Sequence, residues 1–406
     1  MHTAYIDPGA GGPDVEIGEI ESGLRRIPGV HAAAVVAAAE RLVAFFTGAE
    51  LEKAHVRDLL AAGLPEHLVP HILHRLEALP VGDDGVVNTG VLRQLATTLS
   101  PYRPAASATE RWLATAWAEV LDLLPGQIGR DDDFFALGGC SLAAARLVVK
   151  LPGTLSLRLI TACPVLGDLA AAIDAGGQPV GDALVHRLGT PVGASVAGLV
   201  CFPHPGGNAL NFRRLARELA PQRLTVYAVE LPGHDVTEPA EALRGVPEVC
   251  RRVRRELTTV AGPLLLWGHG ATSAYALELA LGLEAAGRPP IAVFLGGPPS
   301  PATNDLAEGE LLGRLRADGA YIELDLLKAE RAAAVVRAYR HDVRSAARHV
   351  AGLPAAPVHA VLAGDDPPAA GAFAVHRLDG AGPYPVRTRP AEVAALVAAV
   401  ATSRRP

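Results

Sequence analysis

The strongest constraint on the fold is an alternation of short apolar runs with longer helical patterns from residue 194 onward. The apolar runs suit strands, and the stretches between them have the apolar spacing of helices. Strands and helices that alternate in this way form a mostly parallel sheet with helices on both faces. We therefore expect an α/β domain over residues 194–406. Its strand-like runs are GLVCF, TVYAVEL, LLLWG, IAVFLGG and VHAVLAG.

Two stretches rich in Pro, Gly and small residues divide the rest of the chain, Leu99–Ala108 and Ala175–Gly193. Both lack strong periodicity and are predicted to be linkers. A length of 406 residues suits roughly two or three domains. We expect a multidomain protein with a small α+β subdomain at 1–98, a helical bundle at 107–175 and the α/β domain at 194–406.

The first segment mixes helical and strand patterns. Glu16–Arg26 has helical apolar spacing, and a second helix fits His55–Ala62. The runs HAAAVVA, RLVAFF and LEALPV suit strands. This mixture predicts the small α+β fold.

Composition and charge exclude several classes of protein. Half of the residues are hydrophobic and a fifth are charged, so the domains can bury real cores. A net charge of -6 argues against a nucleic-acid or membrane-surface binder, and the Arg251–Arg255 cluster is expected to be a solvated helix face. The N-terminal residues do not form a secretory signal, and no apolar run reaches membrane-spanning length. We expect a cytoplasmic protein.

The four cysteines lack the spacing of zinc ligands or of a CxxC motif. They also do not form the dense framework of a small secreted disulfide protein. We therefore predict no metal site. The cysteines are Cys140, Cys163, Cys201 and Cys250.

One serine follows a Gly-Gly pair in the stretch DDDFFALGGCSLAAARLV, residues 131–148. Ser141 precedes the helical pattern Leu142–Leu147, so it lies at or near a helix N-terminus. It could simply cap that helix. The same position also suits a phosphodiester, because free backbone N–H groups and the positive end of the helix dipole stabilise an anion.

This stretch resembles the phosphopantetheine attachment motif of peptidyl carrier domains in nonribosomal peptide synthetases, and the likeness extends over residues 107–175. Cys140 replaces the residue that usually precedes the serine. The resemblance implies covalent 4′-phosphopantetheine on Ser141, installed by a phosphopantetheinyl transferase. It also implies a loading enzyme, such as an adenylating enzyme, and tailoring or condensation enzymes that act in trans. The matching motif residues are Asp132, Phe134, Phe135, Leu137, Gly138, Gly139, Ser141 and Leu142.

The N-terminal segment resembles the small C-terminal subdomain of adenylation domains. EIGEIESGLRRIPGVHAAAVV and LPEHLVPHILHRLEALPV carry the likeness, and the large subdomain is absent. That family has a lysine near the end of this subdomain that neutralises charge on the acyl-adenylate, whereas Val86 stands at the corresponding position. We expect that this piece cannot activate an amino acid alone. It could be a remnant, a spacer or a docking surface.

From residue 194 the chain resembles the α/β-hydrolase thioesterases that accompany such synthetases. CFPHPGGNALNFRRLARELA resembles the loop after the first strand, where a backbone N–H usually helps to form the oxyanion hole. VYAVELPGHD resembles the next strand and its turn. ELLGRLRADGAYIELD resembles the helical lid.

The catalytic positions of that family are degenerate here. The nucleophile elbow G-x-S-x-G corresponds to GHGAT, with Gly270 at the serine position and Thr272 at the second glycine. Pro383 stands where the histidine base is expected, and proline cannot accept or return a proton. Asp366 lies near the expected third member. Without serine and histidine, an ordinary serine hydrolase would lose roughly a millionfold in turnover.

Substitute catalytic groups are the alternative to a silent hydrolase. Ser273 lies just after the elbow, and His204, His269 and His376 are possible local bases.

Our first hypothesis is a carrier that tethers an aminoacyl or peptidyl thioester in natural-product biosynthesis, with a pseudo-thioesterase domain for docking or protection. The rival is an active thioesterase or acyltransferase that uses nonstandard residues to release or transfer the acyl group. A third possibility is that the N-terminal piece completes a separate adenylation core.

Overall fold

The structure is a computed structural model of the whole chain. The residues that it describes are 13–38, 41–48, 56–57, 59–60, 63–64, 69–70, 72–82, 84–99, 102–123, 125–151, 155–176, 183–189, 193–235, 241–297, 306–317, 321, 324, 327, 329–349, 352–364 and 371–403.

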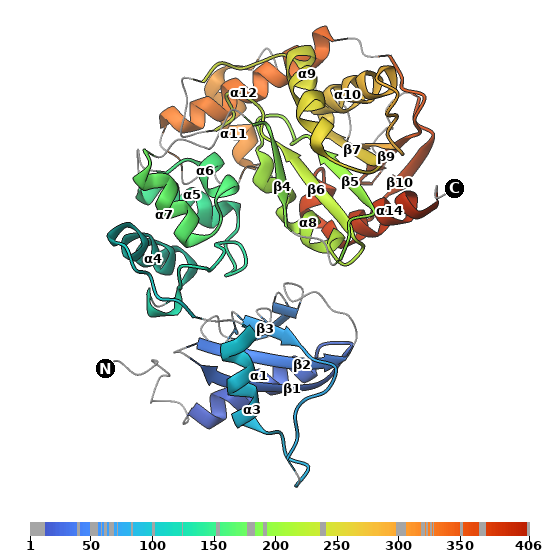
Figure 1. The fold of residues 1–406 in the computed structure, drawn as a ribbon. Helices are drawn as coiled ribbons and strands as arrows, with labels where there is room; N and C mark the ends of the chain where they lie inside the picture. The colour runs from blue at the N-terminus through green and yellow to red at the C-terminus, as the bar shows by residue number, and fades with distance from the viewer. Residues whose placement is uncertain are drawn as a thin grey trace. The chain divides into compact units, whose positions relative to one another are not determined.

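The N-terminal segment is a three-stranded sheet with helices, as expected (Figure 1). β1 and β2 pair antiparallel, and β3 pairs parallel to β2. Of the predicted helix His55–Ala62, residues 56, 57, 59 and 60 are described and helical, and the rest lies outside the described residues. The elements are α1 (Pro13–Arg25), β1 (Val30–Ala38), β2 (Arg41–Gly48), β3 (Ile72–Arg75) and α3 (Thr89–Leu99).

The strand expected over LEALPV was wrong. The third strand is the preceding segment Ile72–Arg75, and within LEALPV only Val81 makes an isolated bridge, to Val87. Pro80 lacks the N–H that a continuing ladder needs. The helix α3 was not expected.

This small sheet has an apolar core on each face. Ile20 and Leu24 of α1 pack with Phe46 on one face. Leu92 of α3 packs with Phe45 on the other face. Successive residues of β2 therefore contribute to opposite cores, as the alternation of side chains in a strand requires.

In the described residues of the segment predicted to be a helical bundle, helices are joined by turns and by an isolated bridge between Asp133 and Val165. A capping box begins its first helix: the backbone N–H of Glu110 donates to the Ser107 hydroxyl at 3.0 Å, and the Glu110 carboxylate accepts the backbone N–H of Ser107. Buried residues of the first and last helices, among them Leu113 and Leu169, give these helices an apolar face. The helices are α4 (Ala108–Leu121), η2 (Pro125–Gln127), α5 (Ser141–Lys150), α6 (Leu157–Ala162) and α7 (Leu166–Asp174).

The C-terminal part is an α/β domain built on a seven-stranded sheet of order β10-β9-β8-β7-β5-β6-β4. All neighbouring strands are parallel except β4, which runs antiparallel to β6 at one edge. This confirms the predicted mostly parallel sheet. The strands are β4 (Val185–Leu188), β5 (Ala197–Cys201), β6 (Leu224–Val229), β7 (Leu264–His269), β8 (Val293–Gly296), β9 (Val358–Leu362) and β10 (Ala374–Arg377).

Helices cover both faces of this sheet (Figure 1). Leu199 of β5 faces the core with α8 and α14, whereas Val200 faces the core with α9 and α10. α11 and α12 lie in the chain between β8 and β9, where the helical lid was expected. The elements are η3 (Ala209–Phe212), α8 (Arg213–Leu219), α9 (Val246–Glu256), η4 (Leu257–Thr259), η5 (Gly270–Thr272), α10 (Ser273–Ala285), α11 (Glu308–Ala317), α12 (Ala329–Arg348), α13 (Pro385–Thr388) and α14 (Pro390–Ser403).

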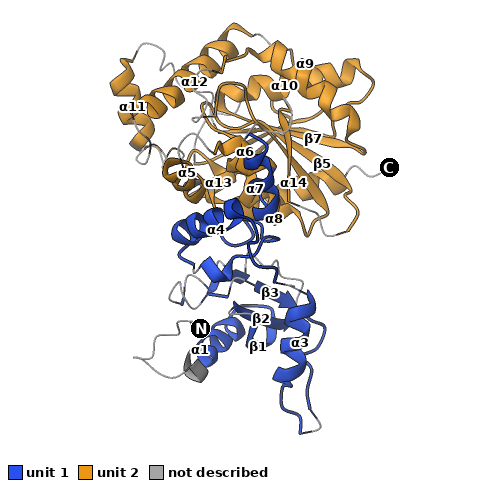
Figure 2. Cartoon of the chain, turned by 60° about the vertical axis from the view of Figure 1, so that its left-hand side comes forward, with its two compact units in different colours: residues 1–139, 163–177 blue, residues 140–162, 178–406 orange. Residues whose placement is uncertain are grey.

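Contacts divide the chain into two compact units (Figure 2). The first comprises residues 1–139 and 163–177, and the second comprises residues 140–162 and 178–406. The predicted bundle 107–175 therefore contributes to both units. In the described parts of the chain, no helix combines the length and apolar character needed to span a membrane.

Candidate functional site

The loop before the Gly-Gly pair is anchored by buried aromatic side chains of the first unit. Phe134 is fully buried, and its ring meets Trp117 edge-on with centroids 5.1 Å apart. Phe135 packs against Phe134 at 5.2 Å, and Leu137 is also buried. The backbone N–H of Gly139 donates to the carbonyl of Phe134 at 2.9 Å. These contacts fix the course of the chain up to the glycine pair.

Each glycine of the pair has its own structural reason. Gly138 has a φ of 103°, in the region that favours glycine. At Gly139 a Cβ would lie 2.4 Å from the ring of Phe134. The first requirement concerns backbone conformation and the second concerns packing.

Asp132 of the motif has a structural role within the first unit. Its carboxylate accepts the backbone N–H of Gly129 at 2.6 Å and pairs with the Arg41 guanidinium, which lies 4.9 Å from the ring centroid of Tyr102. Burial raises the pKa of Asp132, and the charge of Arg41 opposes this shift. Asp132 therefore holds the loop rather than supplying a reactive group.

Ser141 is the first residue of α5, and Cys140 is its N-cap. The Cys140 side chain makes no capping hydrogen bond, so capping does not use the N–H groups of the first turn. Leu142, next in the motif, is half-buried in α5. The position of Ser141 is that of a helix N-terminus suited to an attached phosphodiester, because the dipole and the backbone N–H groups there favour an anion. The residues present thus fit phosphopantetheine.

The second candidate site is the elbow between β7 and α10. Gly270 has a φ of 55°, the left-handed conformation of such a turn. At Gly268 a Cβ would lie 2.7 Å from Cα of Ser273, so strand and helix approach closely here. The turn of a nucleophile elbow is formed, and glycine occupies its tip.

Thr272 ties this elbow to the loop after β5. Its hydroxyl donates to the carbonyl oxygen of Pro203 at 2.5 Å and accepts the backbone N–H of His269 at 3.1 Å. The side chain is fully buried. Thr272, at the position of the family's second glycine, therefore has a structural role, because both of these hydrogen bonds join its hydroxyl to backbone groups.

Aromatic rings fill the space beside the elbow. Tyr384 stacks on His269 with centroids 4.8 Å apart, and its ring also lies 5.0 Å from that of His204. Tyr321 lies 4.8 Å from His204, and its hydroxyl donates to the carbonyl of Pro205 at 2.5 Å. We call His204, His269, Tyr321 and Tyr384 the ring cluster.

The ring cluster encloses only a small cavity, and the His269 imidazole in it is a weak base. The cavity between His204, Trp267, His269 and Tyr384 measures about 20 Å³, roughly the space for one water molecule. Burial, with the nearby His204, lowers the pKa of His269 to about 3. His269 is therefore neutral near pH 7, and this cavity between the described residues is too small for an acyl chain.

Of the other predicted catalytic positions in the described residues, Pro383 lies near the elbow, because its carbonyl oxygen and the His269 ring both lie against Gly297, whereas His376 does not. Pro383 is exposed, and its carbonyl oxygen lies against Gly297 at the end of β8. Ser273 begins α10 and is half-buried. His376 lies on β10, three strands from β7 and thus about 14 Å away at the usual strand spacing. Its Nε2 lies 2.9 Å from Nδ1 of His359. Asp366 lies outside the described residues.

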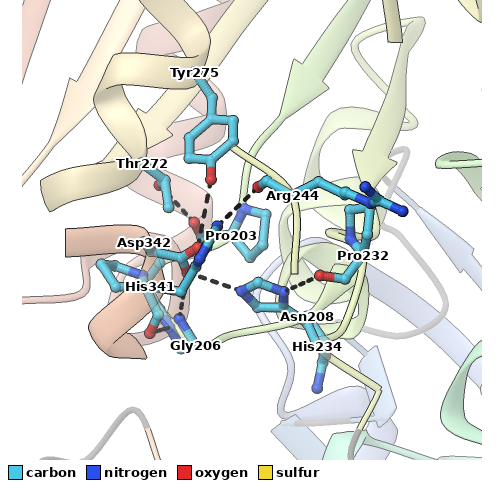
Figure 3. Close-up of polar contacts among 12 residues, drawn as sticks. Pro203, Gly206, Asn208, Pro232, His234, Arg244, Thr272, Tyr275, His341 and Asp342 are labelled. Atoms are coloured by element: carbon cyan, nitrogen blue, oxygen red, sulfur yellow. Dashed lines mark hydrogen bonds and ion pairs between the residues drawn. The ribbon is translucent and has the colours of Figure 1, made fainter. Parts of the chain in front are cut away.

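Sequence reasoning missed a buried ion pair that joins three segments of the α/β domain (Figure 3). Nε2 of His234 lies 2.9 Å from the Asp342 carboxylate, and its Nδ1 lies 3.1 Å from the carbonyl of Pro232. Asp342 also accepts the backbone N–H of Gly206 at 2.8 Å. Burial alone would lower the pKa of His234, but Asp342 raises it above its ordinary value. The only sequence signal was a histidine directly after the Pro-Gly turn.

Two family models match the chain. The model described as Phosphopantetheine attachment site matches residues 111–173, which include Ser141. The model described as Thioesterase domain matches residues 197–347.

Several curated relatives are similar to most of the chain. Phenyloxazoline synthase MbtB of Mycobacterium tuberculosis is 28% identical over 350 residues, which cover 71% of this chain and 24% of that protein. Tyrocidine synthase 3 of Brevibacillus parabrevis is 29% identical, with 67% and 4% covered. Surfactin synthase subunit 3 of Bacillus subtilis is 30% identical, with 68% and 21% covered. The chain thus spans less than a quarter of the length of these relatives.

One solved structure that the chain matches is that of the type II thioesterase BorB from the borrelidin biosynthetic cluster. It is 23% identical, with a TM-score of 0.45, and the match covers 55% of this chain and 100% of that chain.

Proposed function

We propose that this chain, which is homologous to modules of nonribosomal peptide synthetases and combines a phosphopantetheine carrier domain with a thioesterase domain, tethers an aminoacyl or peptidyl thioester without releasing it. The carrier domain bears covalently attached 4′-phosphopantetheine. That group supplies a thiol on a flexible arm, to which an acyl group is bound. We assign its attachment to the hydroxyl of Ser141.

The observation that carries the proposal is the state of the elbow. The left-handed turn is retained at Gly270, but a glycine offers no oxygen that could take over the acyl group. Pro383 offers no imidazole, and the neutral His269 is stacked against Tyr384. A thioesterase domain of this kind has the shape of the family without its nucleophile and base. It suits docking or shielding of the acyl group rather than hydrolysis.

The proposed partners follow from the carrier. A phosphopantetheinyl transferase installs the arm, an adenylating enzyme loads it in trans, and condensation or tailoring enzymes act on the bound acyl group.

The N-terminal segment is proposed to be an adenylation subdomain without activity of its own. Val86, at the position of the family's lysine, lies in a turn and is 64% exposed. Its aliphatic side chain cannot neutralise charge on an acyl-adenylate. The ion pair between Arg41 and Asp132 favours another role for this segment, which is to support the loop that precedes Ser141.

Intact-mass spectrometry tests the attachment site. The chain is incubated with coenzyme A and a phosphopantetheinyl transferase, and we expect one pantetheinyl addition in the wild type and none in Ser141→Ala. Cys140→Ala is the matched control, because it removes the exposed neighbouring thiol and should leave the addition unchanged. An addition that survives in Ser141→Ala, or no addition to the wild type, would overturn the assignment.

A further inference from the structure

A basic groove of about 650 Å³ lies between α12 and the start of α9 in the α/β domain. Its lining residues belong neither to the carrier motif around Ser141 nor to the elbow between β7 and α10. Residues of Leu243–Pro247 line one side of it. On the other side, its basic lining residues are Arg337, Arg340, His341, Arg344, Arg348 and His349.

The arginines of the groove follow one face of α12. Arg337, Arg340, Arg344 and Arg348 are spaced three or four residues apart, which places them in a row along a helix. At a rise of about 1.5 Å per residue, the row is roughly 16 Å long. Four cations at this spacing repel one another, so an anion bound along the row would relieve that repulsion.

Carboxylates of the described residues do not neutralise this row. Within the described part of the chain, no ion pair joins Arg337, Arg344 or Arg348 to an acidic side chain. Glu248 pairs with Arg244 at 3.6 Å, and Glu278 pairs with His349 of the groove lining at 3.0 Å.

The opposite side of the groove is held in place by hydrogen bonds to α12. The backbone N–H of Val246 donates to the Ser345 hydroxyl at 3.2 Å, and Nε2 of His341 lies 3.0 Å from the carbonyl of Arg244. Gly245, the N-cap of α9, has no capping side chain, so the positive end of this helix dipole lies at the groove. Pro247 lacks an N–H and Glu248 adds a carboxylate to the first turn of α9, so the attraction for an anion comes mainly from the arginine row.

We infer that this groove binds a small polyanion that carries two or more phosphate groups. The guanidinium fork matches phosphate oxygens in pairs, and the length of the row exceeds what a single phosphate can span. The volume is that of a small-molecule site rather than of a protein interface. Because the net charge of the chain is -6, the groove is a local concentration of positive charge and not a consequence of a basic protein. This inference does not depend on the proposed carrier function.

Calorimetric titration of the full chain at low ionic strength tests the inference. Inorganic tripolyphosphate is the probe, and we expect saturable binding to one site that weakens as salt is added. Coenzyme A, which carries three phosphate groups, is then tested as a competitor. Displacement by coenzyme A would show that the site accepts an organic polyphosphate, and failure to displace would show that it discriminates against coenzyme A in favour of inorganic polyphosphate.

Charge reversal separates the groove from general electrostatics. Arg344→Glu/Arg348→Glu should weaken binding of tripolyphosphate at least tenfold, and Arg344→Gln/Arg348→Gln should weaken it by a smaller factor. Arg251→Glu/Arg255→Glu makes the same charge change on the exposed face of α9 and should alter affinity less than twofold. Circular dichroism checks that all three variants are folded. Absence of saturable binding to the wild type, or equal weakening in the α9 variant, would overturn the inference.

Discussion

At Gly139 a single hydrogen atom in place of a methyl group decides how the carrier loop packs. Gly139→Ala would bring Cβ to 2.4 Å from the buried ring of Phe134, so the ring or the loop must move. We expect a loss of about 2 kcal/mol in the free energy of unfolding of this region. Urea unfolding followed by tryptophan fluorescence measures it, because Trp117 packs against Phe134.

The matched control is Gly18→Ala in α1. No atom lies within 4 Å of a Cβ at that position, so the substitution should leave stability unchanged or raise it by about 0.5–1 kcal/mol. Equal stabilities of Gly139→Ala and the wild type would show that the loop does not pack as described.

The Gly-Gly pair also shows what the sequence could and could not predict at this scale. The motif located Ser141 and its helix, but it gave no structural reason for the two glycines. A glycine is needed at position 139 because the ring of Phe134 packs against its backbone. Such a contact between a side chain and the backbone cannot be recognised from residue types alone. Likewise, the sequence left open whether Ser141 caps its helix, whereas in the structure α5 begins at Ser141 and Cys140 is its N-cap.

Among the elements of the α/β domain, the His234–Asp342 pair joins α12 to the loops after β5 and β6 (Figure 3). Both nitrogens of the His234 ring face oxygen acceptors, so the charged form is the one that fits. Removing one partner leaves the buried Asp342 uncompensated, and this typically costs about 3 kcal/mol or more. His234→Gln should therefore destabilise the domain.

The pair also predicts a dependence of stability on pH. Since the folded pKa of His234 is raised, its stabilisation is fully present below the ordinary histidine pKa of about 6.5 and is lost as pH rises through the folded value. Differential scanning calorimetry from acidic to alkaline pH should show the wild type losing its advantage over His234→Gln as pH rises. The exposed His31→Gln serves as the control and should follow the wild type. A difference that is constant with pH would contradict the charged pair.

In the α/β domain, the strands at the two edges of the sheet were the ones that the sequence did not predict. The central strands are continuous apolar runs buried on both faces, which is why their pattern was visible. β4, with the sequence VHRL, lies inside the predicted linker Ala175–Gly193, so the sheet begins before residue 194. An edge strand of four residues that mixes polar and apolar side chains has no such run, and β10 was missed for the same reason.

For the whole molecule, the combination of carrier and hydrolase fold was predictable, because each carries a motif with fixed spacing. The state of the hydrolase site was predictable only in part. Gly270 and Pro383 signalled that nucleophile and base are missing, but the stacking of Tyr384 on His269 depends on residues more than a hundred positions apart. The ring cluster therefore became visible only in the structure, and so did the basic row that faces the start of α9.

The lifetime of a loaded thioester tests the central claim most directly. The chain is loaded on Ser141 from an acyl-coenzyme A by a phosphopantetheinyl transferase, and the intact mass is followed over time. We predict that the acyl group is lost at the same slow rate in the wild type, Ser273→Ala and His269→Gln, since none of these side chains performs hydrolysis. Rapid release by the wild type that slows tenfold or more in either variant would contradict a silent thioesterase domain.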